Sequence, residues 1–121
     1  MPNLAIVDDS AIVTEAVVGI IRRAFPAIEI AVFSMGQDIL EALRNGIRYT
    51  AVIMDGKLLD GYTGPMYTSK ILEIASETYI IGFSSQDSMK GLFLKAGARV
   101  FLPKIADTQD IIACVKTALG L

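Results

Sequence analysis

The amino-acid sequence predicts an α/β domain in which a doubly wound, five-stranded parallel sheet carries five helices on its two faces. Short continuous apolar runs, typical of strands that are buried on both faces, recur along the chain. Between them lie segments in which apolar residues return every three or four positions, the spacing of an amphipathic helix. This alternation favours parallel strands that are joined by right-handed helical crossovers.

The first half of the chain contains three predicted strands and two predicted helices. Leu4–Val7 is an apolar run that stops at Asp8-Asp9-Ser10, a cluster typical of helix caps. The helix that follows is closed by Pro26, and its apolar positions are Ile12, Val13, Ala16, Val17, Ile20, Ile21 and Ala24. The remaining elements are a strand at Glu29–Phe33, a helix at about Gly36–Arg44 before the Asn45-Gly46 breaker, and a strand at Ala51–Met54 that ends at Asp55.

The second half begins with a predicted loop. Gly56–Pro65 contains three glycines and a proline, which together disfavour a helix or a strand. A short helix at Asp87–Ala96 ends at Gly97, because glycine is the preferred left-handed residue after a helix. The other predicted elements are helices at Met66–Ala75 and Asp107–Leu119, and strands at Tyr79–Phe83 and Arg99–Leu102, which run into Ser84-Ser85 and Pro103-Lys104.

The composition suits a single domain over residues 1–121 and excludes several classes of function. The chain has 121 residues, of which 53% are hydrophobic, and it contains no histidine and one cysteine. It therefore holds no zinc finger, no Ser-His-Asp or Cys-His catalytic pair and no internal disulfide. We expect the one cysteine, Cys114, to be a small apolar residue of the last helix.

Charge and hydropathy predict a cytoplasmic protein with neither nucleic acid nor a membrane as partner. The formal net charge is -2 and the pI is about 5.0, which argues against a basic surface for phosphates. No apolar run approaches the roughly 18 residues that a membrane helix needs. The N-terminus lacks a basic region followed by a long apolar segment, so nothing directs export.

Polar side chains follow the predicted strands at the point where each strand ends. They are Asp8 and Asp9 after the first strand, Asp55 after the third, Ser84 after the fourth and Lys104 after the fifth. Because ligands bind at the carboxyl ends of parallel strands, we expect these groups to form a site. A simpler role is open for some of them, since Asp9 can cap a helix and Asp55 can serve a turn. Three neighbouring carboxylates repel one another, however, and oxygen ligands favour Mg²⁺ or Mn²⁺ as the neutralising cation.

At these residues the chain resembles the receiver domain of two-component response regulators, over essentially its whole length. The resemblance implies a flavodoxin-like sheet with strand order 2-1-3-4-5. Position by position, the family's acidic pair corresponds to Asp8 and Asp9, its phosphoryl-accepting aspartate to Asp55, its switch hydroxyl to Ser84, its lysine to Lys104 and its switch aromatic to Phe101.

The resemblance implies a phosphoacceptor rather than a turnover enzyme. Asp55 would take a phosphoryl group from the phosphohistidine of a histidine kinase or a histidine phosphotransfer protein. Mg²⁺ or Mn²⁺ would be held by Asp8, Asp9, Asp55 and the backbone carbonyl of Lys57. Since this chain has no histidine, the histidine of the reaction belongs to the partner.

The same resemblance implies a switch. Lys104 would pair with Asp55 before the reaction and with the phosphoryl group after it, while Ser84 would donate a hydrogen bond to that group and Phe101 would turn inward. The changed surface would comprise the fourth helix, the fifth strand and the fifth helix, which would bind an output domain, a target protein or a second copy of the chain.

The chain departs from the family's usual pattern in the loop after Asp55 and in the loop after Lys104. Leu59 and Ile105 stand where prolines are frequent, and Lys57 places a cation beside the site. We expect Lys57 to alter the lifetime of the aspartyl phosphate, and Ser85 is a second candidate modulator. The sequence given contains no helix-turn-helix output domain.

Three alternatives remain open at this stage. A haloacid-dehalogenase-type phosphatase is suggested by Asp55-Gly56-Lys57-Leu58-Leu59-Asp60, but the nucleophile of that motif would then be Ile53, which cannot attack phosphorus. A flavodoxin-like FMN carrier needs a phosphate cradle after the first strand, where Asp8-Asp9 would repel a phosphate. A receiver-like module that binds partners without phosphorylation is the third alternative.

Overall fold

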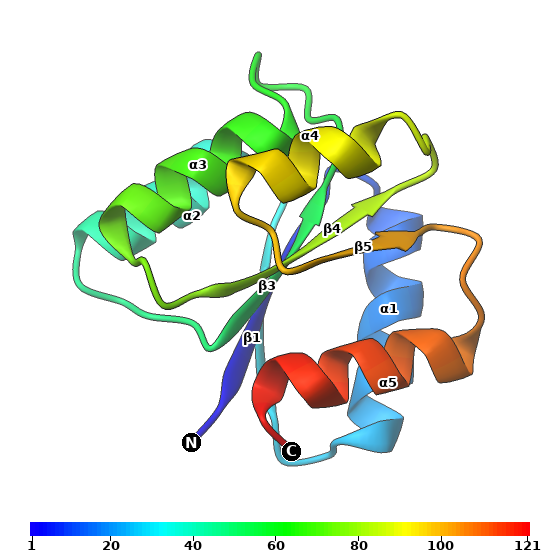
Figure 1. Ribbon diagram of the computed structural model, residues 1–121. Helices are drawn as coiled ribbons and strands as arrows, with labels where there is room; N and C mark the ends of the chain where they lie inside the picture. Colours follow the sequence, from blue (N-terminus) through cyan, green and yellow to red (C-terminus); the bar gives the residue numbers. More distant parts are fainter.

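Five parallel strands form one sheet in the order β2-β1-β3-β4-β5, as the sequence predicts. The computed structural model describes residues 1–121 (Figure 1). Strands and helices alternate along the whole chain: β1 Asn3–Val7, α1 Ala11–Ala24, β2 Glu29–Phe33, α2 Gly36–Arg44, β3 Ala51–Asp55, α3 Gly64–Ile74, β4 Tyr79–Ser84, α4 Met89–Ala96, β5 Val100–Pro103 and α5 Thr108–Leu119. This is the flavodoxin-like fold.

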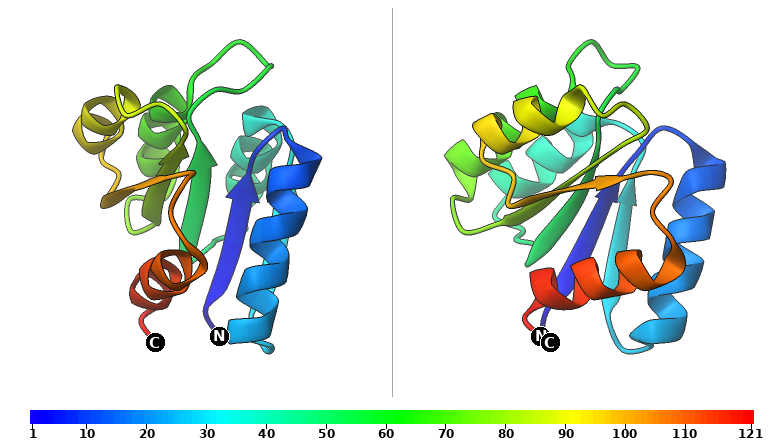
Figure 2. Two further views of the ribbon diagram at one scale, coloured as in Figure 1. Left: turned by 90° about the vertical axis from the view of Figure 1, so that its right-hand side faces the viewer. Right: turned by 45° about the vertical axis from the view of Figure 1, so that its right-hand side comes forward.

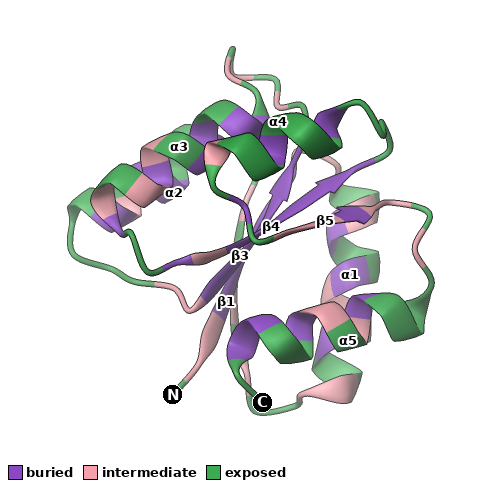
Figure 3. Cartoon of the chain, viewed as in Figure 1, coloured by how far each residue is buried: buried purple, intermediate pink, exposed green.

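The helices divide into two layers around the sheet. Helices α2, α3 and α4 cover one face, and α1 and α5 cover the other (Figures 1 and 2). Each layer has its own core: Leu40, Ile71 and Phe93 belong to the first, whereas Val17 and Val115 belong to the second. The central strand β3 is buried along its whole length (Figure 3). A continuous apolar run is therefore the pattern that such a strand requires.

Local side-chain chemistry sets several helix ends. Ser10 caps α1 through its hydroxyl, which accepts a hydrogen bond from the Val13 amide at 3.3 Å. Asp107 caps α5 in the same way, accepting from the Asp110 amide at 2.9 Å. At the other end of α4, Gly97 adopts φ of 112°, a left-handed conformation that terminates the helix.

Four strands and three helices differ from the predicted bounds by one or two residues. Strands β3 and β4 continue through Asp55 and Ser84, so both polar residues are the last residues of strands rather than the first residues of loops. Helix α3 begins at Gly64 because Thr63 caps it and Pro65 fits its first turn. Helix α4 begins later, at Met89, after a turn that Asp87 and Ser88 form.

The apolar stripe predicted for α1 is wrong at two positions, Ile12 and Ala16, which are both exposed. Ile12 belongs to the predicted apolar stripe, yet its side chain is 83% exposed. The buried residues of α1 are Thr14, Val17 and Ile21. With 3.6 residues per turn, Ile12 lies about 140° around the helix from Val17 and cannot reach the sheet. Thr14 faces the sheet instead, although its hydroxyl kept it out of the apolar pattern.

Cys114 is half-buried and packs against the core beneath α1 and α5. Burial raises the pKa of its thiol, which favours the protonated form. None of the helices is both long enough and apolar enough to cross a membrane.

Candidate functional site

The polar residues that follow the strands meet at the carboxyl edge of the sheet. Asp8 and Asp9 follow the end of β1, Asp55 ends β3 and Ser84 ends β4. Lys104 follows the end of β5 directly. Since β3 lies between β1 and β4 in the sheet, Asp55 occupies the centre of the arrangement.

Three carboxylates lie close together in this site. Asp8, Asp9 and Asp55, the acidic trio, each offer an oxygen within 4.8 Å of the others. Asp8 and Asp55 are 3% and 6% exposed, whereas Asp9 is half-buried. Asp8 is fixed in place because its Oδ1 accepts a hydrogen bond from the Ser10 amide at 2.9 Å. The trio is therefore held closely together at the margin of the core.

Lys104 supplies the positive charge of the site. Its ammonium group lies 2.9 Å from Asp55 Oδ1 and 3.1 Å from Asp8 Oδ2. The backbone of Lys104 is positioned by β4, since its amide donates to the Ser84 carbonyl at 3.0 Å. The ammonium also lies 5.6 Å from the centre of the Phe83 ring. One lysine thus bridges two of the three carboxylates.

Burial and neighbouring charges shift the pKa values of this pair. Burial raises the pKa of Asp55 above its ordinary value of 3.8, and the carboxylates of Asp8 and Asp9 add to the rise, against the opposing effect of Lys104. Burial alone would lower the pKa of Lys104, but hydrogen bonds to Asp55 and Asp8 raise it above 10.5. Lys104 therefore stays charged at neutral pH.

The donor set fits a hard divalent cation. All candidate ligands of the acidic trio are carboxylate oxygens, which Mg²⁺, Mn²⁺ and Ca²⁺ prefer. Asp8 Oδ2 is buried and has no hydrogen-bond partner, so it has only its ion pair with Lys104 to offset its burial. A cation would satisfy this oxygen and reduce the mutual repulsion of the three charges.

Ser84 ends the strand next to that of Asp55, and its hydroxyl makes no hydrogen bond to Asp55. Its Oγ accepts a hydrogen bond from the Gln86 amide at 3.1 Å, which fixes the first turn of the β4–α4 loop. Ser84 also packs against Gly56, where a Cβ atom would lie 2.8 Å from Oγ. Only glycine leaves space for the hydroxyl there. Ser85, in contrast, is exposed.

Phe101 lies on β5 and its ring is close to α4. It pairs with Gly82 in the β4–β5 register, and its ring is half-buried, 6.1 Å from the centre of the Phe93 ring of α4. Lys57 lies in the β3–α3 loop with an exposed side chain, and its backbone pairs with Thr63. The roles of Phe101, Lys57 and Ser85 stay predictions.

Sequence reasoning missed one residue near the site. Asp60 sits in the β3–α3 loop, and its Oδ2 accepts a hydrogen bond from the Gln37 amide at 3.3 Å, at the start of α2. An Asp-Gly pair in a loop usually indicates only a turn. No local pattern reveals that such a carboxylate reaches a helix 23 positions away.

Solved structures of receiver domains resemble the whole chain. The BeF₃-activated receiver domain of DrrB matches 100% of this chain and 99% of that chain, at 25% identity and a TM-score of 0.84. The response regulator DrrB of Thermotoga maritima, an OmpR/PhoB homolog, matches at 25% identity and a TM-score of 0.82. This match includes 99% of the present chain and 53% of the DrrB chain. A CheY-like receiver domain protein of Methanospirillum hungatei has 20% identity and a TM-score of 0.86, covering 99% of this chain and 94% of that one.

A model of the response regulator receiver domain matches residues 4–116. No curated protein matches the chain in a sequence search. The matched range includes the acidic trio, Ser84 and Lys104, and the fold and strand order are those of the structural relatives. The chain therefore belongs to the response regulator receiver domain family.

Proposed function

We propose that this chain is a phosphoacceptor of a two-component signalling system and that Asp55 is the residue that receives the phosphoryl group. The observation that carries the proposal is the pairing of Asp55 with Lys104 at 2.9 Å beside two further carboxylates. Asp55 is at the centre of the site, and family membership supports the same role. The chain would accept one phosphoryl group and would not be an enzyme that converts a substrate repeatedly.

The geometry supports attack by one particular oxygen of Asp55. Lys104 holds Oδ1, which leaves Oδ2 to attack the phosphorus atom of a phosphohistidine. A new O–P bond forms while the P–N bond breaks, and the electron pair of that bond leaves with the imidazole. Lys104 stays near the reacting group and offsets the charge that gathers on the phosphoryl oxygens.

We assign the metal-binding role to the acidic trio together with the Lys57 carbonyl. Mg²⁺, or Mn²⁺ in its place, neutralises the attacking carboxylate and the phosphoryl oxygens when it is bound. The residues of the chain contribute in different ways. Asp9 and Asp55 would be direct ligands, and Asp8, which is already engaged by Ser10 and Lys104, would act mainly through bound water.

Read-out would start at Ser84. Ser84 Oγ accepts from the Gln86 amide, so its own proton is available to a phosphoryl group on Asp55, and this new hydrogen bond would draw the β4–α4 loop toward the site. Phe101 would follow into the space that this movement opens, and its contact with Phe93 would carry the change to α4. We propose that α4, β5 and α5 form the surface that an output domain, a target protein or a second copy of the chain recognises.

An apolar margin around the site supports a protein as phosphodonor. Three large apolar side chains from three different segments are almost fully exposed at this end of the molecule: Ile12 at 83%, Leu59 at 92% and Ile105 at 92%. Isolated exposed residues are common, but three around one charged site favour a protein contact. We propose that they pack around the phosphohistidine of a histidine kinase or of a histidine phosphotransfer protein.

A mass measurement with a small phosphodonor tests the function. We expect the protein, incubated with acetyl phosphate and Mg²⁺, to gain one phosphoryl group in its intact mass. Mild hydroxylamine should remove the group, because it cleaves acyl phosphates and leaves phosphoserine intact. Asp55→Asn should gain nothing, whereas Asp87→Asn, which changes an exposed carboxylate, should react like the wild type.

Two outcomes would contradict the proposal. A wild-type protein that gains no mass with any donor, although it binds Mg²⁺, would indicate a module that works without phosphorylation. Repeated hydrolysis of a phosphate ester would indicate a phosphatase.

A further inference from the structure

The β3–α3 loop is held only at its base by its own backbone. The Gly64 amide donates to the Gly56 carbonyl at 2.8 Å, and Lys57 pairs with Thr63 in an isolated antiparallel bridge. Beyond this base the loop projects past the carboxyl end of the sheet (Figure 2). Gly61 has φ of 94°, a conformation that glycine adopts readily. Ordering such a segment carries an entropic cost that contacts at the tip must offset.

Asp60 makes a contact that fixes the tip to α2. Its Oδ2 accepts a hydrogen bond from the Gln37 amide at 3.3 Å, in the first turn of that helix. The residue before the helix, Met35, offers no side-chain cap. Asp60 thus takes the place of a capping residue from another part of the chain, and its negative charge lies at the positive end of the helix dipole.

A buried tyrosine lies close enough to Asp60 for the carboxylate to affect its pKa. Tyr67 of α3 is 0% exposed, and its ring packs where a Cβ atom on Gly36 would collide with it. Asp60 Oδ1 and the Tyr67 hydroxyl are both buried, and neither has a hydrogen-bond partner. Burial, with the Asp60 carboxylate as a further cause, raises the pKa of Tyr67 to about 12. The hydroxyl therefore keeps its proton and is able to donate a hydrogen bond to a carboxylate.

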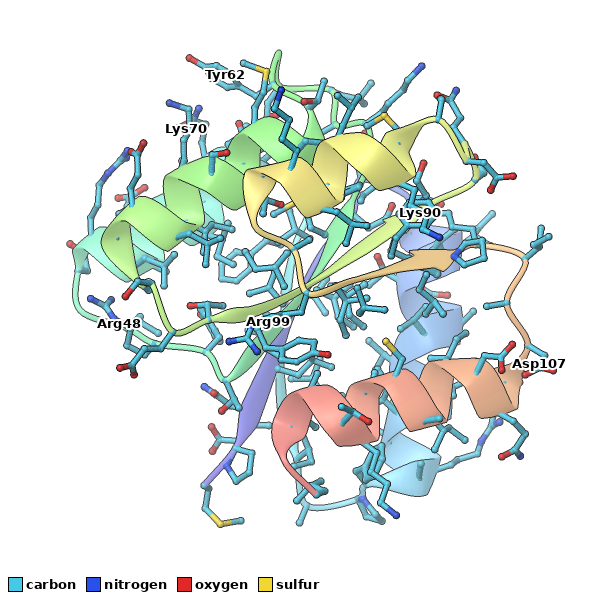
Figure 4. The ribbon with its side chains drawn as sticks, in the orientation of Figure 1. Arg48, Tyr62, Lys70, Lys90, Arg99 and Asp107 are labelled. Atoms are coloured by element: carbon cyan, nitrogen blue, oxygen red, sulfur yellow. The ribbon has the colours of Figure 1, made fainter.

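Aromatic packing holds the segment after Asp60. The Tyr62 ring meets the Tyr67 ring edge-on at 5.5 Å between centres. Lys70 places its ammonium 5.1 Å from the centre of the Tyr62 ring, and both side chains lie together above α3 (Figure 4). The loop is therefore fixed at both sides of Gly61, to α2 by Asp60 and to α3 by Tyr62.

We propose that Asp60 is a positioning residue for the metal site: by anchoring the loop to α2, it keeps the Lys57 carbonyl available as a ligand beside the acidic trio. The inference rests on the proposed function, because it concerns the same metal. Lys57 is three positions from Asp60 and lies in the bridged base of the loop. A loop released from α2 visits other conformations, and each metal-binding event must then order it again.

Three variants of Asp60 and one matched control test the proposal. Asp60→Ala removes the acceptor, and Asp60→Asn keeps an oxygen for the Gln37 amide. Asp60→Glu keeps the charge but displaces it by one methylene. The control Asp38→Ala removes an exposed carboxylate from the same first turn of α2 without touching the loop.

The measurements are the Mg²⁺ dissociation constant by calorimetry and the amide exchange of residues 57–63. For Asp60→Ala we expect a dissociation constant raised about tenfold, the scale of lost support around metal ligands, and faster exchange of the loop amides. Asp60→Asn should stay within about twofold of the wild type, since the hydrogen bond to Gln37 persists. Asp38→Ala should bind Mg²⁺ like the wild type, although it loses a favourable charge at the helix end.

Several results would overturn the proposal. They are an unchanged dissociation constant in Asp60→Ala, an equal loss in Asp38→Ala, or a wild type that binds no Mg²⁺. If Asp60→Ala fails to fold, Asp60→Glu takes its place, because its displaced carboxylate should bind Mg²⁺ more weakly than Asp60→Asn. Equal Mg²⁺ dissociation constants for Asp60→Glu and Asp60→Asn would contradict the proposal. Mg²⁺ titration needs no phosphoryl group, so a wild type that binds Mg²⁺ but is never phosphorylated refutes the proposed function and leaves this inference intact.

Discussion

The Lys104 ammonium lies 2.9 Å from Asp55 Oδ1, although the two residues are 49 positions apart. The contact reaches across β4, from the strand that ends in Asp55 to the segment after β5. It provides the buried carboxylate with a counter-charge before any metal or phosphoryl group arrives. The same lysine also serves Asp8, so it is the one cation that balances the centre of the site.

Removal of Lys104 should weaken both the fold and the reaction. Lys104→Met leaves Asp8 and Asp55 buried without a counter-charge, and loss of one partner from a buried pair costs roughly 3–5 kcal/mol. Because the Lys104 side chain is 21% exposed, we expect a smaller loss, about 2 kcal/mol. Urea unfolding without metal measures it, and added Mg²⁺ should restore part of the stability. Lys90→Met, on the exposed face of α4, is the control; an equal loss there would argue against a specific role for Lys104.

The stability of the metal-free protein should depend on Asp55 in a particular pH range. Burial raises the pKa of Asp55 above 3.8, so the folded state retains a proton that the unfolded state has released. Ionisation of Asp55 thus destabilises the fold, and the stability is lost as the pH rises through this range. Asp55→Asn cannot ionise, so only the wild type loses stability in this way. We expect the unfolding free energy of Asp55→Asn to exceed that of wild type by an amount that grows between about pH 4 and about pH 7. A gain that shrinks as the pH rises would contradict this explanation.

Ser84→Ala should separate phosphorylation from its read-out. The variant loses the hydrogen bond from the Gln86 amide, at a cost of about 1 kcal/mol in unfolding free energy. We expect the rate of phosphorylation to stay within about threefold of wild type, which is less than 1 kcal/mol in barrier height. The chemical-shift changes of Phe101 and α4 on addition of BeF₃⁻ and Mg²⁺ should shrink by half or more. Ser88→Ala, which alters no side-chain cap of α4, should respond fully, and a full response from Ser84→Ala would exclude the switch.

Lys57 should lengthen the lifetime of the aspartyl phosphate. Its exposed ammonium adds a positive charge in the loop beside Asp55, where it attracts the phosphoryl oxygens. An exposed charge pair contributes about 0.5–1 kcal/mol, so Lys57→Asn should lose its phosphate about two to five times faster. The decay of the phosphorylated mass after removal of the donor measures this rate. Lys95→Asn provides the control on α4; equal decay rates in wild type and Lys57→Asn would refute a role for Lys57.

The sequence predicts the strands and the central residues of the site for one physical reason. A parallel strand that is buried on both faces needs a continuous apolar run, so a polar residue at its end marks both the edge of the sheet and the site. Asp55 and Ser84 are found in this way, and the structure brings Asp55 together with Lys104 and the other two carboxylates.

Other features depend on contacts that no local pattern contains. Ile12 follows the apolar spacing of α1 and is nevertheless exposed, while Thr14 is buried. The apolar spacing alone does not determine which residues of the helix face the sheet. The anchoring of Asp60 to α2 requires the folded loop and the packing of Tyr67 under Gly36. Such contacts become visible only once three separate segments are placed in space.

Mapping of the phosphorylated residue tests the central claim most directly. Borohydride reduces an aspartyl phosphate to homoserine, which fragmentation of the digested protein assigns to a single position. After incubation with acetyl phosphate and Mg²⁺, we expect homoserine at position 55 and at no other position. Homoserine at Asp8, Asp9 or Asp60 in place of Asp55, or none in a protein that binds Mg²⁺, would contradict the assignment of Asp55 as the phosphoacceptor.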